Sequence, residues 1–296
     1  MVKNQNCKIC NSENLNIIHH VAICRECGVL LYYPYPESDK EIFLKKKYTK
    51  DNIAISSNKK ETESRQLNYI LKSGNLNIKN FQQMINFSIP KSQKDEEIKI
   101  LDYGGGAGQF ASICKLIFPL SKIYITDLYD EKLLEKYKPF NKQIKFNEFE
   151  KDNSKFDFIF LNDVFEHLSD PSDVLKLLKN KLINHKSRIF IDTPKKFWIY
   201  DLTSIFSQSI YKKILFGTVD QDHQQIWSKK SYYIVAKNSG LKVDKYKELT
   251  EFTQQPSFYL DAMRVNNFYL RLLVKIFYFF APLIARNKIV STLKVN

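Results

Sequence analysis

Four cysteines near the start of the chain could bind a metal ion. They form two Cys-x-x-Cys pairs separated by thirteen residues: Cys7 and Cys10, then Cys24 and Cys27. Four thiolates with this spacing are typical of structural zinc sites, and four protein ligands leave no position open for catalysis. His19 and His20 lie between the pairs and are not needed as ligands. Close cysteine pairs in a cytosolic chain bind metal far more often than they form disulfides. Fortuitous cysteines and redox-active pairs are the alternatives.

A glycine-rich loop follows the first strongly apolar strand-like run. Segment 100–109 reads Ile-Leu-Asp-Tyr-Gly-Gly-Gly-Ala-Gly-Gln and then enters a helical pattern. A dinucleotide fingerprint would require glycine at position 109, where Gln109 stands. Asp102 suits a cationic ligand better than a pyrophosphate, because a carboxylate repels phosphates. S-adenosylmethionine, which carries an ammonium and a sulfonium, fits this pattern.

Further polar groups follow two other apolar runs. Asp127 ends the run 123–126 about 20 residues after the loop, where a carboxylate can accept hydrogen bonds from both ribose hydroxyls. The run 156–161 leads directly into Asn162 and Asp163. Polar residues at the carboxyl ends of parallel strands face the ligand, so we expect these residues at a binding site.

Two histidines beside acids are candidate general bases. The main hypothesis assigns proton removal to His223, oriented by its neighbour Asp222. His167, which follows Glu166, is the second candidate, and a reaction without a side-chain base is the third. Cys114, in the helix after the glycine loop, is interpreted as a buried apolar residue rather than a nucleophile.

The order of strand-like and helical patterns predicts the fold. We expect strands at 98–103, 122–126, 144–147, 156–161, 188–192 and 241–246, with helices at 110–118, 131–137, 174–182 and 231–239. This alternation predicts an α/β fold with a doubly wound, mostly parallel sheet. We divide the chain into a zinc-binding module (1–36), a helical connector (37–97), a catalytic domain (98–262) and a C-terminal amphipathic extension (263–296).

The motifs together resemble a known enzyme family. Segments 102–108 and 162–168 and Asp127 look like motif I, the post-strand-four motif and the strand-two acid of class I S-adenosylmethionine-dependent methyltransferases. The resemblance spans about residues 98–246 and is nearest to the branch related to ubiquinone-pathway enzymes. It implies a seven-stranded Rossmann-like sheet, here with a small zinc-ribbon-like module before it and a helical extension after it.

The same resemblance implies roles for individual residues. The methionine end of the cofactor would be held by Asp102, Gly104, Gly106 and Gly108. Asp127 would bind the ribose, and Leu128 and Glu148 would lie near the adenine. Asn162 and Asp163 would flank the sulfonium. Gly105 stands where these enzymes commonly have Cys or Ser.

The acceptor is inferred by resemblance alone. The cysteine module resembles the N-terminal zinc module of bacterial sugar C-methyltransferases and of related enzymes in surface-polysaccharide pathways. This implies methyl transfer to a sugar, as a small molecule or a lipid-linked glycan precursor, with release of S-adenosylhomocysteine. One alternative is an RNA-base methyltransferase, although residues 162–165 read Asn-Asp-Val-Phe rather than the Asn/Asp-Pro-Pro-aromatic motif common in those enzymes. The other is a scaffold that keeps the fold without turnover.

Charge and hydropathy constrain the partners. The formal charge is +14, but the lysines are spread over the chain, so a nucleic-acid partner is not expected. The start of the chain has no apolar signal region, and no apolar run reaches the roughly 18 residues of a membrane span, which favours the cytoplasm. The aromatic segment 266–288 has cations around it, a composition typical of an interfacial helix at the inner face of a membrane. Packing of this segment against the domain is the alternative.

Overall fold

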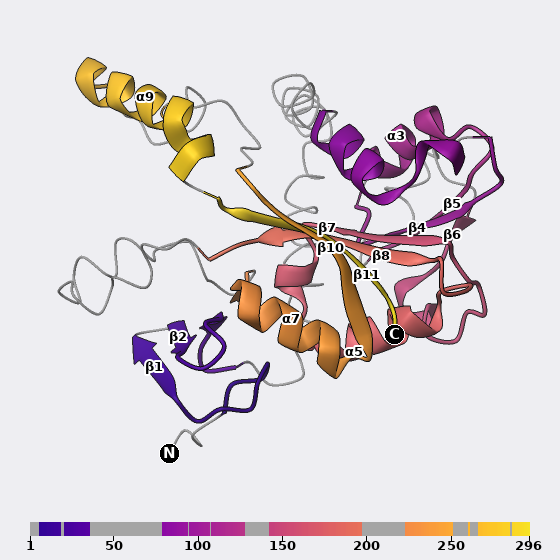
Figure 1. The fold of residues 1–296 in the computed structure, drawn as a ribbon, viewed down its shortest axis with the longest axis horizontal. Helices are drawn as coiled ribbons and strands as arrows, with labels where there is room; N and C mark the ends of the chain where they lie inside the picture. Colours follow the sequence, from indigo (N-terminus) through magenta and orange to yellow (C-terminus); the bar gives the residue numbers. More distant parts are fainter. Residues whose placement is uncertain are drawn as a thin grey trace, which may run out of the picture.

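The computed structural model describes residues 6–18, 21–35, 79–93, 95–106, 108–127, 142–196, 223–250, 260, 266–284 and 286–296 (Figure 1). The helix expected at 131–137, most of the connector, Leu128 and Asp222 lie outside these residues.

A seven-stranded sheet runs through the centre of the molecule in the order β10-β11-β8-β7-β4-β5-β6. Its strands are β4 (Lys99–Tyr103), β5 (Lys122–Thr126), β6 (Lys142–Gln143), β7 (Phe158–Asn162), β8 (Arg188–Pro194), β10 (Leu241–Leu249) and β11 (Lys288–Val295). Neighbours from β6 to β8 are parallel, whereas β11 is antiparallel to both β8 and β10. The predicted mostly parallel sheet is confirmed.

Helices cover both faces of this sheet (Figure 1). Helix α3 (Gln109–Ile117) and a helical stretch at 79–88 pack on one face, where they share a core with β4, β5 and β7. Helices α5 (Pro171–Asn180) and α7 (Lys229–Asn238) pack on the other. Short 3₁₀ turns occur at Lys91–Gln93, Phe146–Glu148 (η3) and Phe165–His167 (η4). The sheet is therefore doubly wound, as predicted.

Local sequence determines where the helices on the second face begin and end. The Asp170 side chain accepts a hydrogen bond from the Asp173 N–H, and Pro171 occupies the first turn of α5. Ser228 and Ser231 form a reciprocal capping box at the start of α7. Gly240, at φ 70°, follows the end of α7 and allows the chain to turn into β10.

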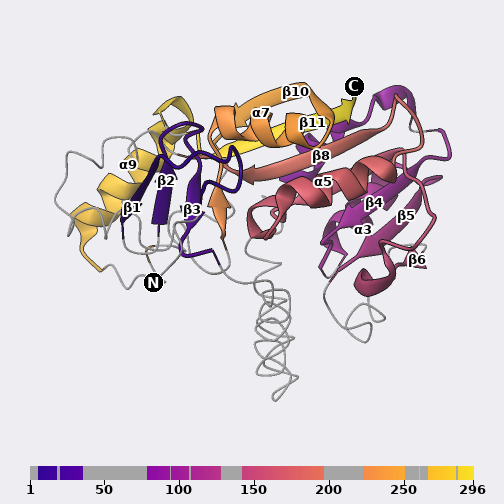
Figure 2. The same ribbon diagram turned by 90° about the horizontal axis from the view of Figure 1, so that it is seen from below.

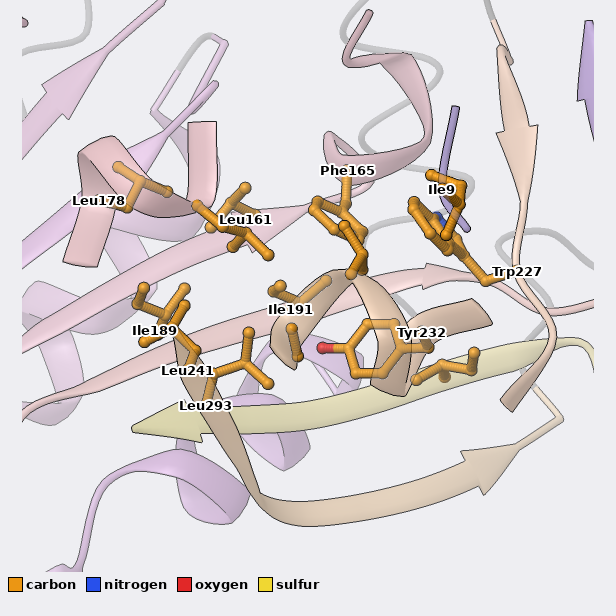
Figure 3. Packing of buried hydrophobic residues seen from close by; sticks show 14 of the residues in the cluster. Ile9, Leu161, Phe165, Leu178, Ile189, Ile191, Trp227, Tyr232, Leu241 and Leu293 are labelled. Atoms are coloured by element: carbon orange, nitrogen blue, oxygen red, sulfur yellow. The ribbon is translucent and has the colours of Figure 1, made fainter. Parts of the chain in front are cut away.

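The N-terminal module is a second, antiparallel sheet that is completed by a distant part of the chain. Its order is β1 (Leu15–Ile18), β2 (Val21–Cys24), β3 (Leu30–Tyr32) and β9 (Gln225–Ile226). Figure 2 shows β1 to β3 at one end of the molecule and β4 to β6 at the other. Figure 3 shows Ile9 of the module beside Trp227, whose ring stacks on Phe165 with centroids 4.7 Å apart. The module and the large sheet thus share one hydrophobic core.

Two expectations from the sequence are wrong. Residues 288–295 do not belong to a C-terminal extension, because they form β11 inside the large sheet. Polar residues (Lys288, Ser291 and Thr292) are buried within this strand, so its sequence reads neither as an apolar run nor as an alternation, and a long insertion separates it from β10. The strand expected at 144–147 is also not observed: the two-residue β6 comes just before it, and turn η3 occupies most of it. Ile144 and Phe149, on either side of η3, are buried although neither lies in a strand.

The insertion between β10 and β11 contains α9 (Phe268–Ile284). Among the described helices, none combines the length and the apolar character needed to cross a membrane.

Candidate active site and cysteine cluster

The glycine loop connects the carboxyl end of β4 to α3. The Gly104 N–H donates to the Thr126 carbonyl (2.8 Å) and the Gly106 N–H to Asp127 Oδ2 (2.6 Å), which fixes the loop against the end of β5. Gly106 has φ 52°, and a Cβ built there would meet no atom within 4 Å. The backbone at Gly106 therefore faces open space, as close approach of a ligand requires.

Gly105 faces inward instead. A Cβ at this position would lie 2.6 Å from Asp102 Oδ2 and 2.6 Å from Ile125 Cγ1. The replacement of the usual Cys or Ser by glycine therefore lets the loop lie directly over Asp102 in this chain.

Asp102 carries a buried carboxyl group that lies directly under the glycine loop. Its Oδ2 has no hydrogen-bond partner among the described residues. Burial, and next the charge of Asp127, raise the pKa of Asp102 to about 8. A cationic group beside it would restore ionisation, so the site fits a ligand that carries an ammonium.

Asn162 and Asp163 stand at the carboxyl end of β7, as predicted. Both polar atoms of the Asn162 amide are buried without a partner in the described part of the chain. Asp163 has φ 50°, a left-handed conformation that costs energy in a residue other than glycine and is often found at functional sites. Its side chain is 53% exposed. These two residues thus offer hydrogen-bonding groups at the same edge as the glycine loop.

Lys288, the first residue of β11, holds Asp163 in place. Its Nζ contacts Asp163 Oδ1 and lies 2.9 Å from Asp192 Oδ1, while only 8% of its side chain is exposed. Surrounding protein atoms disfavour the Asp163 charge, but the Lys288 ammonium outweighs them, so the pKa of Asp163 lies below its usual value. Sequence reasoning missed this role and assigned Lys288 to a membrane-facing segment. No local signal marks it, because its partner is 125 residues away.

The two candidate histidines lie together. The ring centroids of His167 and His223 are 4.9 Å apart, and each ring has a nitrogen within 4.8 Å of a Glu166 oxygen. Glu166 is buried and accepts a hydrogen bond from Thr193 Oγ1 (3.0 Å). Burial, and next the charge of Asp163, raise the pKa of Glu166 to about 8. The sequence placed His167 and His223 as alternatives, whereas the structure brings them into one cluster.

Two buried glutamines hold this cluster together. Gln225 Nε2 donates to the carbonyls of Phe165 (2.8 Å) and Leu168 (2.9 Å), and Gln224 Nε2 donates to the His167 carbonyl (3.2 Å). Sequence reasoning missed both residues. In the sequence, only their position directly after His223 indicates that they lie near the site.

The remaining predicted cofactor residues are less informative. Gly108 has φ 77° and lies directly before α3. Glu148 is exposed in η3 and pairs with Lys145 (3.7 Å). Cys114 is buried in α3, which fits an apolar role.

The four N-terminal thiols converge on one point. All four sulfur atoms lie within 4.8 Å of one another, with Cys7 Sγ 3.7 Å from Cys27 Sγ and Cys10 Sγ 3.5 Å from Cys24 Sγ. Zn–S bonds of about 2.3 Å in a tetrahedron place the sulfur atoms roughly 3.8 Å apart. The separations therefore suit a tetrahedral metal better than disulfides, which need about 2.05 Å.

The cluster is tied to the candidate active site. The Ser228 hydroxyl donates to the Cys27 carbonyl, and the Tyr32 N–H donates to the Gln224 carbonyl (2.9 Å). The segment that follows His223 thus joins the cysteine module on one side and the histidine cluster on the other.

Comparison with known proteins identifies the class. A family model described as "Methyltransferase domain" matches residues 77–246, more than half of the 296-residue chain. The chain belongs to this family, and it is an S-adenosylmethionine-dependent methyltransferase with the Rossmann-like fold of that class.

Solved structures that are similar to this chain share little sequence identity with it. The plantazolicin methyltransferase BpumL, solved in complex with SAH, is 17% identical with a TM-score of 0.49, over 80% of this chain and 91% of that one. The N,N-8-amino-8-demethyl-D-riboflavin dimethyltransferase RosA from Streptomyces davawensis is 10% identical with a TM-score of 0.48, over 80% of this chain and 58% of that one. No curated protein sequence matches the chain.

Proposed function

We propose that this methyltransferase acts on a sugar acceptor, in a nucleotide-activated or lipid-linked glycan precursor of a cell surface. The observation that carries the proposal is the histidine pair, His167 and His223, beside Asp163 at the carboxyl edge of the sheet. A polar edge with carboxylates and imidazoles suits an acceptor that has several hydroxyls. The resemblance of the cysteine module to that of sugar methyltransferases supports the same class.

The glycine loop and the acids around it would bind the cofactor. Asp102 is suited to the ammonium of the methionine part, because Oδ2 of its buried carboxyl group has no hydrogen-bond partner among the described residues. Asp127, which accepts from the Gly106 N–H, would also accept from the ribose hydroxyls. Gly104, Gly106 and Gly108 would line the methionine part, and the unpaired amide of Asn162 would face the sulfonium side. Leu128 and Glu148 remain proposed neighbours of the adenine.

When bound, S-adenosylmethionine supplies an electrophilic methyl group. The chain must then place the acceptor atom in line with that group and receive the proton that the acceptor loses. His223 is the proposed base, with Asp222 as its orienting acid and His167 as the alternative position for the same proton. The Asp163 carboxylate, which Lys288 keeps ionised, lies close enough to both imidazoles to stabilise the imidazolium that would form.

The cysteine cluster would hold a structural zinc ion. Its four thiols form a complete ligand set, so the metal would have no open position for substrate. Its proposed contribution is to fold the N-terminal module, which is too small to be stable alone, and to hold β9 and the segment after His223 in place.

A transfer assay tests the acceptor. Purified protein is incubated with methyl-labelled S-adenosylmethionine and one of three acceptor pools: nucleotide-activated sugars, lipid-linked glycans or total RNA. We expect label in a glycan pool, S-adenosylhomocysteine in equal amount, and neither with the His223→Ala variant. Label in RNA alone would overturn the sugar acceptor, and cofactor binding without turnover on any pool would favour a non-catalytic scaffold.

A further inference from the structure

Helix α9 (Phe268–Ile284) carries a large exposed apolar surface. It projects away from the sheet, and none of the other described elements packs closely against it (Figure 1). Eight of its apolar side chains are at least 45% exposed: Phe268, Tyr269, Leu270, Leu272, Leu273, Ile276, Phe279 and Phe280. A contiguous apolar surface of this kind on a folded protein marks an interaction site.

The exposed apolar side chains form a broad face rather than a narrow stripe. With about 100° between successive residues, these eight side chains spread over roughly 200° of the helix circumference. Arg271 and Lys275, one turn apart, lie together outside that arc. A helix that docks into a protein groove uses a narrow row of anchors at i, i+3 or i+4, and i+7. A broad apolar face with cations along its border is the pattern of a helix that lies in a membrane interface, where long basic side chains reach up to the headgroups.

The charged side chains from residue 262 onward are all positive. From residue 262 to the last residue the chain contains no Asp or Glu, and its six cations are Arg264, Arg271, Lys275, Arg286, Lys288 and Lys294. Lys288 and Lys294 pair with acids of the sheet, whereas Arg271 and Lys275 belong to α9 and Arg286 follows it. The formal charge of the whole chain, which includes these cations, is +14. Self-association through α9 would bring these like charges together, whereas an anionic surface would attract them.

We propose that α9 binds the surface of an anionic lipid bilayer and lies parallel to it. A helix of 17 residues is about 26 Å long, shorter than the roughly 30 Å of a bilayer core, which suits a position in the interface. Its exposed aromatic and leucine side chains enter the acyl region, and Arg271 and Lys275 remain at the level of the phosphate groups.

The helix is joined to the edge of the sheet that carries the active site. β10 ends at Leu249, which pairs with Lys288 at the start of β11, so the insertion containing α9 leaves and rejoins the sheet beside Asp163. The Asn287 carbonyl accepts from the Lys195 N–H (2.7 Å), which fixes this junction. Membrane binding therefore brings the acceptor side of the site to the lipid surface. The consequence that the acceptor is lipid-linked rests on the proposed function, whereas the membrane contact itself does not.

Co-sedimentation of the full-length protein with vesicles tests the proposal. The probes are vesicles of phosphatidylcholine alone and of phosphatidylcholine mixed with phosphatidylglycerol, at low and high salt. We expect binding to the anionic vesicles that weakens as salt increases. The double variant Leu273→Gln/Phe279→Gln, at side chains 62% and 79% exposed, should lower partitioning by roughly tenfold or more. The double variant Arg271→Gln/Lys275→Gln should bind the anionic vesicles more weakly, and its binding should change less between low and high salt.

Leu116→Gln/Leu120→Gln is the matched control, because these side chains are also exposed but lie on and after α3. It should bind vesicles as the unaltered protein does. Protein that stays in solution at low salt, or equal loss of binding in the control, overturns the proposal. So does light scattering that shows a dimer dissociated by Leu273→Gln/Phe279→Gln, since α9 would then cover a second copy. Calorimetry with S-adenosylmethionine on the same samples separates this result from a failure of the proposed function.

Discussion

The cysteine cluster and the carboxyl edge of the sheet are both built from polar or reactive groups, but they are completed differently. The four thiols of the cluster face one another at 3.5 and 3.7 Å and form a full set of ligands from the module alone. At the carboxyl edge, Asp102 Oδ2 and the Asn162 amide have no partner among the described residues, and Gly106 faces open space. The first arrangement is suited to hold an ion permanently, and the second to exchange ligands. Their connection through residues 223–228 means that the closed region supports the open one.

Removing a thiol from the cluster should produce the largest effect. We expect Cys24→Ser to lose the single zinc equivalent and to lower the free energy of unfolding by on the order of 5 kcal/mol, because metal binding stabilises such a module by more than that. Metal analysis and thermal unfolding measure both. Because the module and the segment around His223 pack in one core, we expect turnover to fall as the module is destabilised. Cys114→Ala removes a thiol outside the cluster and should keep the zinc. Protein that is fully folded and free of metal would contradict the assignment.

Changing the histidines should affect turnover and leave the fold intact. His223→Ala is expected to reduce kcat by roughly 10²–10⁴-fold with nearly unchanged cofactor affinity, because it removes the proton acceptor. The exposed His185 provides a matched control, and His185→Ala should turn over normally. If His167→Ala gives the large loss and His223→Ala does not, the base is His167.

Changing Asp127 should affect cofactor binding more than turnover of the bound complex. We expect Asp127→Ala to weaken binding by about 1–3 kcal/mol, since charge-assisted hydrogen bonds to the ribose are lost. Calorimetry measures this loss. Asp127→Asn keeps an oxygen that can accept from the Gly106 N–H but removes the charge. The loss of affinity in Asp127→Asn therefore reports on the charged contacts to the ribose, and the further loss in Asp127→Ala reports on support of the loop. Unchanged affinity in Asp127→Ala would rule out the ribose role, and Asp95→Ala, at an exposed acid, should bind normally.

The smallest expected effect concerns pH. The pKa of Asp102 is raised to about 8, so at neutral pH this carboxyl is mostly protonated in the ligand-free protein. A bound ammonium favours the ionised form, so binding must release a proton below pH 8. Affinity should therefore rise with pH up to about 8, by at most about tenfold per unit. Asp102→Asn should remove this part of the dependence, whereas titration of the ligand itself is the same in both proteins. Equal pH profiles would show that Asp102 does not bind the cation.

Local patterns in the sequence predicted a large part of this molecule. The alternation of strands and helices from 98 to 246 predicted the parallel part of the sheet, because its buried strands read as short continuous apolar runs and its helices repeat apolar residues every three or four positions. The glycine loop, Asp127 and Asn162 were predicted to lie near one another, since the carboxyl ends of neighbouring parallel strands meet at one edge. Strand β11 was missed because it buries polar residues (Lys288, Ser291 and Thr292) among its apolar ones, so its sequence is neither a continuous apolar run nor a regular alternation.

The sequence by itself determined those sites whose residues are close together along the chain. Each Cys-x-x-Cys pair and the glycine loop consist of a few consecutive residues, so the residue types and their spacing are sufficient to identify them. Only the tertiary structure decided which distant groups meet: Lys288 with Asp163, Gln225 with the carbonyl of Phe165, and β3 with β9. These contacts depend on which strands become neighbours and on what the shared core buries, and no local periodicity encodes that.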